Sequence, residues 1–518
     1  MLWLRGVAGR MGRIRPRMAV NLREVIMENM NRQSLFLIIL GALLVYLLPP
    51  LNTEKTPKEP PEEQYSPGAV ESDMILSPDQ LEERQEGEIA AAKEEKHRLV
   101  KRNARKDASY HWPGAIIPYL IDDNAADYEG TIKSAMEHWE NQTCLRFKPY
   151  TNQLGESLGH HDYISLEKGD GCSSPVGRQR TGSQTISLGS SCNFLGTAAH
   201  EIGHSLGFYH EQTRPDRDQY VTIQTNNLKP KTHHNFVMYE RTEGSDYQIP
   251  YDLGSIMHYG AKYYSKNGKL TIKTQDSRVQ SVIGQREELS FFDIKLANLM
   301  YKCGDGCDLS KECSNHGYLG PGCQCVCPLG LTGDTCTEVK TLTAGCGGVL
   351  TASSGTITSP NYPQPYGQSQ DCIWFIPGGP GRKVTLTFDK FSLEADSYCA
   401  YDWLEIRILG PQFRGPRFCG KKPPNFPIEL RNEGLFLRFH SDDADSYPGF
   451  SASYKVETIT MPVNGGWTTW GDWQKCSASC GYGIKKRTRK CSDPKPAYGG
   501  AGCEGRPLEF LKCSNGPC

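Results

Sequence analysis

The twenty cysteines constrain the fold of this 518-residue chain more than any other feature. They are absent from the first 143 residues and then occur in successive blocks of four, six, four and six. Even numbers in successive blocks predict separate disulfide-bonded modules in an oxidising compartment. A chain of this length is too long for one hydrophobic core, and the usual domain size predicts about three to five domains. The formal net charge of −1 gives no reason to expect a nucleic acid as a partner.

The N-terminus has the composition of an export signal. A basic region, residues 1–33, precedes an apolar segment, residues 34–49, whose uninterrupted apolar run is fourteen residues long. A membrane span needs about 20 residues, so the length fits the core of a signal peptide better. No small-residue cleavage site follows, and the positive-inside rule favours the alternative of an uncleaved type II signal anchor. Both interpretations predict a secreted, extracellular product.

Residues 50–102 form a predicted linker or pro-segment. They are rich in Pro, Glu, Lys and Gln and hold almost no aromatic residues, a composition that does not build a core. The segment runs into "HRLVKRNARKD", a basic stretch that an exported chain presents to trypsin-like or furin-like processing proteases.

Residues 103–303 read as one globular domain. Apolar residues recur at helical spacing over 126–141 and predict an amphipathic helix there, and "AIIPYLI", "YISLEK" and "SQTISLG" read as strands. "SFFDIKLANLMYKC" predicts a closing helix with Ser290 and Asp293 as its N-terminal cap. The one N-glycosylation sequon, at Asn141, falls where the first helix should end.

The stretch "HEIGHSLGFYH" predicts a catalytic metal site. His200 and His204 are four residues apart and share one face of a helix. Gly207 tolerates the left-handed geometry that ends a helix, so His210 can return to the same ion. Three neutral imidazoles with an open position indicate zinc, which brings the pKa of a bound water down toward roughly 7.

Glu201 lies beside these ligands and is the candidate general base for that water. HExxH alone also occurs by chance, as one more polar helix. Here Gly207 and His210 stand in register, and "SIMHYG" follows at residues 255–260, so we interpret the stretch as functional.

The extended motif HExxHxxGxxH with a methionine turn resembles the metzincin clan, and HExxHxxGFxHExxRxDRD with SIMHY resembles the astacins. The resemblance implies a two-lobed α+β zinc endopeptidase in which the zinc helix forms the floor of the cleft. It also implies that Met257 forms a turn beneath the metal. Tyr259 would be a further zinc ligand that swings away and donates its hydroxyl to the oxyanion, and the alternative for both residues is core packing.

The resemblance gives the processing region a meaning. Glu211 matches the astacin residue that meets the mature N-terminal amino group, and the family register places cleavage after Arg102, with Asn103 first. A start at Lys106 is the alternative. The astacin pro-segment carries an FxGD motif whose Asp occupies the place of the water on zinc. The matching Asp73 is the candidate latency ligand, although two of the three motif positions differ and it could be one more acid in an acidic linker.

Three small modules are expected after the protease. Residues 304–337 resemble an EGF-like module, which its size predicts to be held by disulfides. Residues 346–456 read as an all-β sandwich and resemble a CUB domain, in which Glu394, Asp402 and Asp442 match a calcium site. The alternative is a solvated acidic rim.

Residues 464–518 resemble a thrombospondin type 1 repeat, with Trp467, Trp470 and Trp473 predicted to interleave with Arg487 and Arg489. The basic run Lys485–Lys490 is a candidate site for sulfated glycans, and the alternative is that its arginines only stack on tryptophan.

All the cysteines are expected in disulfides. The blocks are Cys144, Cys172, Cys192 and Cys303; Cys307, Cys313, Cys323, Cys325, Cys327 and Cys336; Cys346, Cys372, Cys399 and Cys419; Cys476, Cys480, Cys491, Cys503, Cys513 and Cys518. The astacin resemblance implies the pairs Cys144–Cys303 and Cys172–Cys192, whereas spacing alone leaves three pairings open.

The module order resembles that of nematode-type astacins linked to cuticle and matrix remodelling. The expected function is a secreted or shed zinc endopeptidase, made as a latent proenzyme and acting on extracellular matrix or cuticle proteins. The alternative is a matrix-binding or adhesive protein with an inactive protease domain, and a purely structural zinc site would require a closed set of four ligands.

Overall fold

The computed structural model describes residues 73–77, 80, 104–105 and 108–514. The last range has gaps at 239–243, 246, 248, 309, 341–342, 460–464, 478, 480–481, 493–494, 496–501 and 504–506. The expected basic region, apolar segment and processing residues Arg102, Asn103 and Lys106 lie outside these residues, as do Cys480 and Cys518. Within the described part of the chain, no helix has the length and apolar composition needed to cross a membrane.

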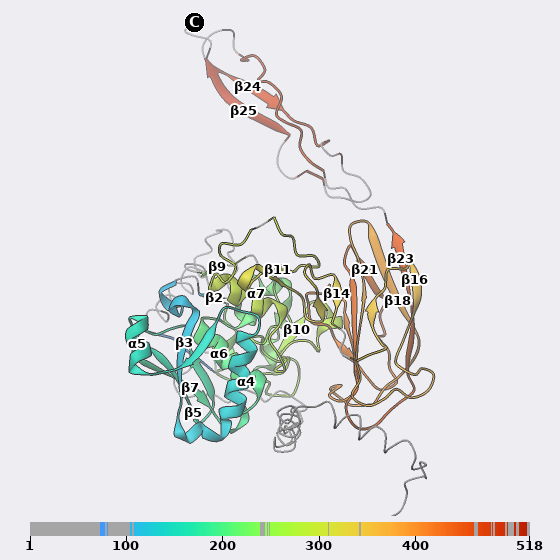
Figure 1. The fold of residues 1–518 in the computed structure, drawn as a ribbon. Helices are drawn as coiled ribbons and strands as arrows, with labels where there is room; N and C mark the ends of the chain where they lie inside the picture. Colours follow the sequence, from blue (N-terminus) through green and yellow to red (C-terminus); the bar gives the residue numbers. More distant parts are fainter. Residues whose placement is uncertain are drawn as a thin grey trace, which may run out of the picture. The chain divides into compact units, whose positions relative to one another are not determined.

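A six-stranded sheet supports the first lobe of the protease part (Figure 1). Its strands run in the order β1-β6-β7-β5-β3-β4. Strands β3, β4, β5 and β7 pair in parallel, and β6 pairs antiparallel to β7. The bounds are β1 Met74–Ile75, β6 Cys172–Pro175, β7 Ser183–Leu188, β5 Tyr163–Glu167, β3 Ile116–Ile121 and β4 Arg146–Pro149. The three strands expected from apolar patterns are therefore confirmed as β3, β5 and β7.

Helix α4 (Glu129–Glu140) confirms the amphipathic helix, although it begins three residues later than expected. Residues 126–128 instead end a 3-10 helix, Asp123–Tyr128, whose first turn is capped by the Asp122 side chain. The face expected to be apolar is buried, with Ile132, Met136 and Trp139 each at most 4% exposed. The sequon residue Asn141 is the C-terminal cap of this helix and is exposed, as the sequence predicted.

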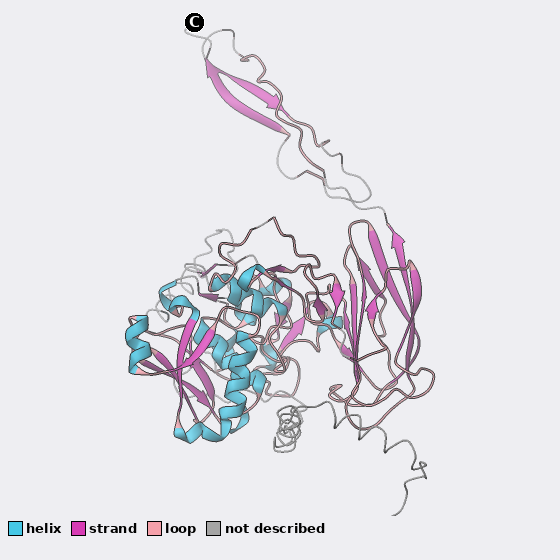
Figure 2. Cartoon of the chain, viewed as in Figure 1, coloured by secondary structure: helices cyan, strands magenta, loops and turns pink. Residues whose placement is uncertain are grey.

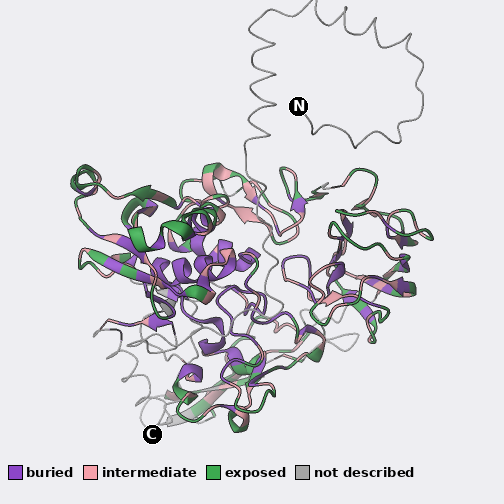
Figure 3. Ribbon diagram, turned by 90° about the horizontal axis from the view of Figure 1, so that it is seen from below, coloured by how far each residue is buried: buried purple, intermediate pink, exposed green. Residues whose placement is uncertain are grey.

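Helix α6 (Leu195–Leu206) packs directly against α4. The indole Nε1 of Trp139 donates a hydrogen bond of 3.0 Å to the carbonyl oxygen of Ala199. Eleven of the twelve α6 residues are buried, and buried chain dominates the centre of this part in Figure 3. A helix buried on every side is positioned by its neighbours rather than by solvent, so its side chains are held firmly.

The second lobe contains little regular structure. It holds the two-stranded pair β8 (Val221–Ile223) and β10 (Ile272–Thr274), short 3-10 helices and the closing helix α7 (Phe291–Met300). A further two-stranded pair joins β2 (Ala104–Arg105) to β9 (Gly244–Ser245). Helix α5 (Asn152–Leu158), by contrast, belongs to the first lobe. The expected cap of α7 is confirmed: the side chains of Ser290 and Asp293 bond each other's backbone N–H groups in a capping box.

Among their described residues, the C-terminal modules contain strands and one short 3-10 helix, Pro321–Cys323, whereas the protease part mixes helices and strands (Figure 2). The expected sandwich consists of a five-stranded and a four-stranded sheet. The first comprises β15 (Gly348–Val349), β17 (Asp371–Ile376), β22 (Leu435–His440), β19 (Trp403–Arg407) and β20 (Arg417–Phe418), and the second β16 (Ser354–Thr358), β23 (Gly449–Thr458), β18 (Arg382–Ser392) and β21 (Ile428–Arg431). The Cys307–Cys336 module has two short hairpins, β11 (Tyr318–Leu319) with β12 (Cys325–Val326) and β13 (Leu331–Thr332) with β14 (Glu338–Val339).

The last module is a thin two-stranded ribbon of β24 (Tyr482–Thr488) and β25 (Leu508–Ser514). The Arg487 guanidinium lies 5.0 Å from the Trp470 ring centroid and 4.7 Å from that of Trp473. Arg489 lies 4.4 Å from Trp467 and 4.5 Å from Trp470. The predicted alternation of tryptophan and arginine is confirmed, and it stabilises a module with almost no apolar core.

Eighteen cysteines lie in the described residues and form nine disulfides. In the protease part the pairs are Cys144–Cys303 and Cys172–Cys192, as the family resemblance implied. The remaining pairs are Cys307–Cys323, Cys313–Cys325, Cys327–Cys336, Cys346–Cys372, Cys399–Cys419, Cys476–Cys513 and Cys491–Cys503. Every pair stays within one module, so the grouping of cysteines into modules is confirmed for these residues.

The packing of α6 predicts the effect of adding one methyl group at Gly203. A Cβ there would lie 2.9 Å from the Met257 sulfur, which must shift, and 3.3 Å from Cζ2 of Trp139, which is tighter than an ordinary contact. We expect Gly203→Ala to lower the free energy of unfolding by about 1–3 kcal/mol, because overpacking forces neighbours out of place. The matched control is Gly130→Ala on α4, where a Cβ meets nothing within 4 Å. That change should stabilise the helix by about 0.5–1 kcal/mol. Denaturant unfolding followed by tryptophan fluorescence measures both, and equal stabilities for the two variants would contradict this packing.

Candidate active site

Helix α6 and the turn after it bring three histidines together. His200 and His204 lie one turn apart on α6, and Gly207 adopts a left-handed conformation with φ 108° that ends the helix. His210 follows this turn, and the three ring centroids are 4.7, 4.8 and 5.5 Å apart. None of the three side chains is exposed. The convergence expected from the motif spacing is thus the geometry that the fold adopts.

Backbone carbonyls orient two of these imidazoles. The Nδ1–H of His200 donates to the carbonyl oxygen of Ile256 at 2.8 Å, and that of His204 donates to Phe208 at 2.9 Å. With the proton on Nδ1, the lone pair on Nε2 points into the cluster and is available to a metal. Burial lowers the pKa of His204 well below its usual value, and the neighbouring His200 and His210 lower it further. The ring is therefore neutral, as a metal ligand must be.

Asp73, which lies in the expected pro-segment, is placed among the three histidines. Its Oδ2 is 3.2 Å from Nε2 of His200, and its Oδ1 is 3.1 Å from Nε2 of His210 and 3.9 Å from Nε2 of His204. The side chain is completely buried. The structure therefore brings the candidate latency residue to the ligands across 127 residues of sequence.

These four residues fit a zinc ion. One donor atom from each of them lies within 4.8 Å of all the others, and three imidazole nitrogens with one carboxylate oxygen are a ligand set that zinc prefers. The hydrogen bonds at the far nitrogens of His200 and His204 supply the outer shell that zinc-binding histidines usually have. A zinc ion at the centre would also offset the free-energy cost of burying the charged Asp73 carboxylate.

Two further motif residues border this cluster. The Tyr259 ring is fully buried and packs against His210, with ring centroids 4.5 Å apart. The Met257 side chain lies beneath α6, against Gly203, and its carbonyl oxygen accepts a hydrogen bond of 3.1 Å from the backbone N–H of Glu211. Glu201 is fully buried on the same helix as the first two histidines. All the residues predicted for the chemistry are therefore part of one buried region.

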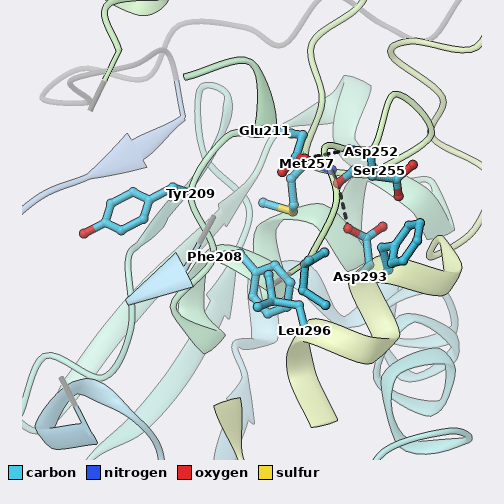
Figure 4. A pocket seen from close by; sticks show the side chains of 10 residues that line it. Phe208, Tyr209, Glu211, Asp252, Ser255, Met257, Asp293 and Leu296 are labelled. Atoms are coloured by element: carbon cyan, nitrogen blue, oxygen red, sulfur yellow. Dashed lines mark hydrogen bonds between the residues drawn. The ribbon is translucent and has the colours of Figure 1, made fainter. Parts of the chain in front are cut away.

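A small cavity is lined by Glu211 together with Asp252 and Asp293, and Met257 also borders it (Figure 4). One Glu211 oxygen accepts hydrogen bonds from the Asp252 backbone N–H at 2.8 Å and from Arg214 at 3.0 Å. The hydroxyl of Ser255 donates to Asp293 at 2.6 Å. Three carboxyl groups around one cavity form a site suited to a cation.

Burial controls the ionisation of these acids. It raises the pKa of Glu211 to about 8, with the Arg214 charge acting in the opposite direction. It raises the pKa of Asp252 to about 7, and the charge on Asp293 adds to the effect. Burial also raises the pKa of Asp293. Carboxyl groups that are costly to ionise are those that gain most from a cation placed among them.

Sequence reasoning missed the network that holds this cavity together. The Arg214 guanidinium donates to both oxygens of Asp216, at 2.9 and 3.0 Å, and to the carbonyl oxygen of Ile249. Arg217 donates to the carbonyl oxygens of Gln212 and Phe236. The signal was present in the "RPDRD" tail of the motif, which identifies the family without showing what each residue does. Asp216 and Glu211 lie within three residues of Arg214 in the sequence, whereas the carbonyl groups of Ile249 and Phe236 are distant, and spacing does not reveal them.

The sandwich module contains a separate acidic cluster. Donor oxygens of Glu394, Asp402 and Asp442 lie within 4.8 Å of one another. The Asp442 backbone N–H donates to Asp402 at 2.9 Å, and the hydroxyl of Tyr366 donates to the other Asp402 oxygen. Burial raises the pKa of Glu394, and the charges of Asp402 and Asp442 raise it further. The structure thus brings together the three residues that the sequence singled out.

Three family models match the chain. They are the Astacin peptidase family over residues 104–302, the CUB domain over 346–454 and the thrombospondin type 1 domain over 468–518. These ranges cover three of the four modules expected after the pro-segment.

Curated relatives extend over several of these modules. Protein SpAN of Strongylocentrotus purpuratus is 42% identical over 414 residues, which cover 79% of this chain and 66% of SpAN. Blastula protease 10 of Paracentrotus lividus is 41% identical over 79% of this chain and 71% of its own length. Zinc metalloproteinase nas-36 of the nematode Caenorhabditis elegans is 34% identical over 88% and 75%. Nematode relatives are thus present, as expected, but those from the other two organisms share more identity. The chain belongs to the astacin family of zinc metalloendopeptidases.

Proposed function

We propose that this chain is made as a latent proenzyme and that its mature form is a secreted or shed endopeptidase of extracellular matrix or cuticle proteins. One observation carries the proposal. His200, His204 and His210 converge around one point, and the fourth donor that the described residues bring to that point is Asp73, which lies in the segment that we propose is removed on activation. A closed structural zinc site would take its fourth ligand from the mature domain instead.

The residues divide the chemistry among them. When bound, the zinc ion supplies a Lewis acid that activates a water molecule and polarises the peptide carbonyl. Glu201 accepts a proton from that water and passes it to the departing amine. Tyr259, packed against His210, donates its hydroxyl to the negative charge that develops on the carbonyl oxygen. The buried position of Glu201 strengthens its action because water does not screen its charge.

The pro-segment blocks the site in two ways. Asp73 occupies the position next to the three imidazole nitrogens, and the strand that follows it, β1, pairs with edge strand β6. The backbone N–H of Ser174 donates to the Asp73 carbonyl oxygen at 2.8 Å, and Val176 donates to Ile75 at 3.3 Å. An added strand on this edge takes the backbone groups that an extended substrate would use.

Activation is proposed to use the cavity at Glu211. Cleavage after Arg102 would create an amino terminus at Asn103, one residue before Ala104. Ala104 is fully buried and forms a β-bridge with Phe208, which lines that cavity. The new ammonium group would then start close to a cavity lined by three carboxyl groups, of which Glu211 pairs with Arg214. A start at Lys106 would remove Ala104, so this placement favours Asn103.

The other modules are proposed to select where the enzyme acts. The Cys307–Cys336 module, with three internal disulfides and two hairpins, is assigned as an EGF-like spacer. Calcium is proposed at Glu394, Asp402 and Asp442, because a divalent ion relieves the repulsion among three convergent carboxylates. The basic run Lys485–Lys490 of the last module is a proposed contact for sulfated glycans.

The competing hypothesis is an adhesive protein whose protease domain is inactive. Glu201→Gln distinguishes the two, because it keeps the shape of the side chain and removes the base. We expect the mature variant to retain zinc and to lose about 10²- to 10⁴-fold in kcat/KM on a protein substrate, the range for loss of a general base. Glu137→Gln, on the exposed side of α4, is the matched control and should keep full activity. Equal and negligible cleavage by zinc-loaded wild type and variant would reject the enzyme.

Latency is tested by Asp73→Ala in the uncleaved proenzyme. Removing the carboxylate takes away the group nearest the three imidazoles, so we expect the variant to cleave a short peptide at least about tenfold faster than the uncleaved wild type. Glu71→Ala removes an acid two residues earlier and should leave latency intact. A peptidase assay with intact pro-segments, checked by gel, measures both. Identical low activity in the two variants would show that Asp73 does not keep the enzyme latent.

A further inference from the structure

The second lobe of the protease carries a lysine patch whose two segments contain no acidic residue. The patch is made by residues 221–231 and 261–274, which hold six lysines and neither Asp nor Glu. The lysines are Lys229, Lys231, Lys262, Lys266, Lys269 and Lys273. Five of them are exposed and Lys229 is half-buried. The two segments thus carry six positive and no negative side chains in a chain whose formal net charge is −1.

Backbone pairing holds the two segments side by side. Strands β8 and β10 pair antiparallel, with Lys273 opposite Thr222. Strand β10, which carries Lys273, is labelled in Figure 1. Ile272 and Thr274 are buried while Lys273 is exposed, so the strand alternation directs Lys273 to solvent. The backbone N–H of Lys229 donates to the carbonyl oxygen of Tyr264 at 2.8 Å, which extends the contact beyond the strands.

A closed loop presents two further lysines. The hydroxyl of Ser265 donates to the carbonyl oxygen of Lys269 at 2.7 Å, and the N–H of Lys269 donates to the Asn267 side chain at 3.1 Å. Gly268 supplies the positive φ of 72° that this turn needs. Lys266 and Lys269 therefore leave the same tight turn.

Asn227 joins that loop to the other segment. Its side-chain nitrogen donates to the carbonyl oxygen of Leu270 at 2.7 Å, and its side-chain oxygen accepts from the Asn267 amide at 3.0 Å. Its backbone carbonyl accepts from the N–H of Lys266 at 2.9 Å. The lysines are thus mounted on a cross-linked backbone, which reduces the entropy lost when they bind a partner.

The acids that flank the two strands in the sequence are paired with arginine. Asp218, just before β8, is 3.3 Å from Arg217, and Asp276, just after β10, is 2.6 Å from Arg278. In these pairs the arginine partly compensates the negative charge of each acid, so Asp218 and Asp276 weaken the positive potential of the patch less. A field of one sign attracts an extended polyanion and raises its rate of association.

We propose that this patch binds a sulfated polysaccharide and holds the protease lobe on a glycan-rich matrix. Lysines spread over two segments suit repeated anionic groups along a chain, whereas a single small anion would engage only one or two of them. A disulfide-bonded, extracellular chain meets sulfated polysaccharides, which supply that repeat. The site is separate from the basic run of the C-terminal repeat, and the two together would bind one glycan chain with higher avidity than either alone.

The test uses the full-length secreted protein and immobilised heparin as the probe. Lys231→Gln, Lys266→Gln, Lys269→Gln and Lys273→Gln are combined in one variant. We expect it to leave the column at lower NaCl than wild type and to bind heparin roughly 10- to 100-fold more weakly at about 0.15 M NaCl, since exposed ion pairs add up and are screened by salt. Its cleavage of a short peptide should be unchanged, because none of the four lysines belongs to the catalytic machinery.

A matched variant separates the patch from overall charge. Lys133→Gln, Lys148→Gln, Lys168→Gln and Lys302→Gln remove the same charge elsewhere on the protease domain and should leave binding nearly unchanged. A third variant, Lys485→Gln with Lys486→Gln, reports the contribution of the C-terminal repeat. Desulfated heparin and phosphatidylserine vesicles serve as the comparison ligands.

Equal heparin affinity for wild type and the patch variant would overturn the proposal, as would an equal loss in the matched variant. It would also fail if heparin binding disappeared entirely in the C-terminal variant, if desulfated heparin bound as tightly, or if only the vesicles bound. The proposal is supported if the patch variant binds heparin more weakly than the matched variant. Combining the patch and C-terminal substitutions should then weaken heparin binding further.

Discussion

Because helix α6 ends at Gly207 in a left-handed turn, the chain reverses within three residues and returns His210 to the histidines it has just left. A residue with a side chain at Gly207 would be strained in this conformation. The same turn sets Glu211 against the carbonyl of Met257, so the metal cluster and the acidic cavity share one short piece of backbone. Gly203 on α6 leaves room for the Met257 sulfur, so the backbone that carries Met257 can pack close to this helix. The site therefore depends on two glycines that perform no chemistry.

Burial of polar groups is the second constraint on this region. Glu211, Arg214 and Asp216 are almost completely buried, which is tolerable only because each is hydrogen-bonded. Such a network adds little to the free energy of unfolding, but it holds the loop after His210 in one conformation. The cavity beside it is lined by Glu211, Asp252 and Asp293, and burial raises the pKa of all three carboxyl groups.

The local parts of this structure were predictable from the sequence. The spacing of His200 and His204, the stop at Gly207 and the cap at Ser290 depend on residues within a few positions of one another, and all were expected. Helix α4 began late because a capped 3-10 turn competes for its first residues. The long-range parts were not predictable from spacing. The contacts of Arg214 with Ile249 and of Arg217 with Phe236 depend on the folded chain. So do the grouping of Asp252 and Asp293 around one cavity and the disulfide pairing inside the Cys307–Cys336 module.

The coordination of zinc in the proenzyme tests this account most directly. X-ray absorption at the zinc edge of the purified, uncleaved protein, with metal content measured in parallel, reports the ligand types and their distances. We expect one zinc ion per chain with only nitrogen and oxygen neighbours at about 2.0–2.2 Å, three of them imidazoles. We also expect the oxygen contribution to change after the proposed pro-segment is removed. Sulfur neighbours near about 2.3 Å, or a fourth imidazole that persists in the mature protein, would contradict it.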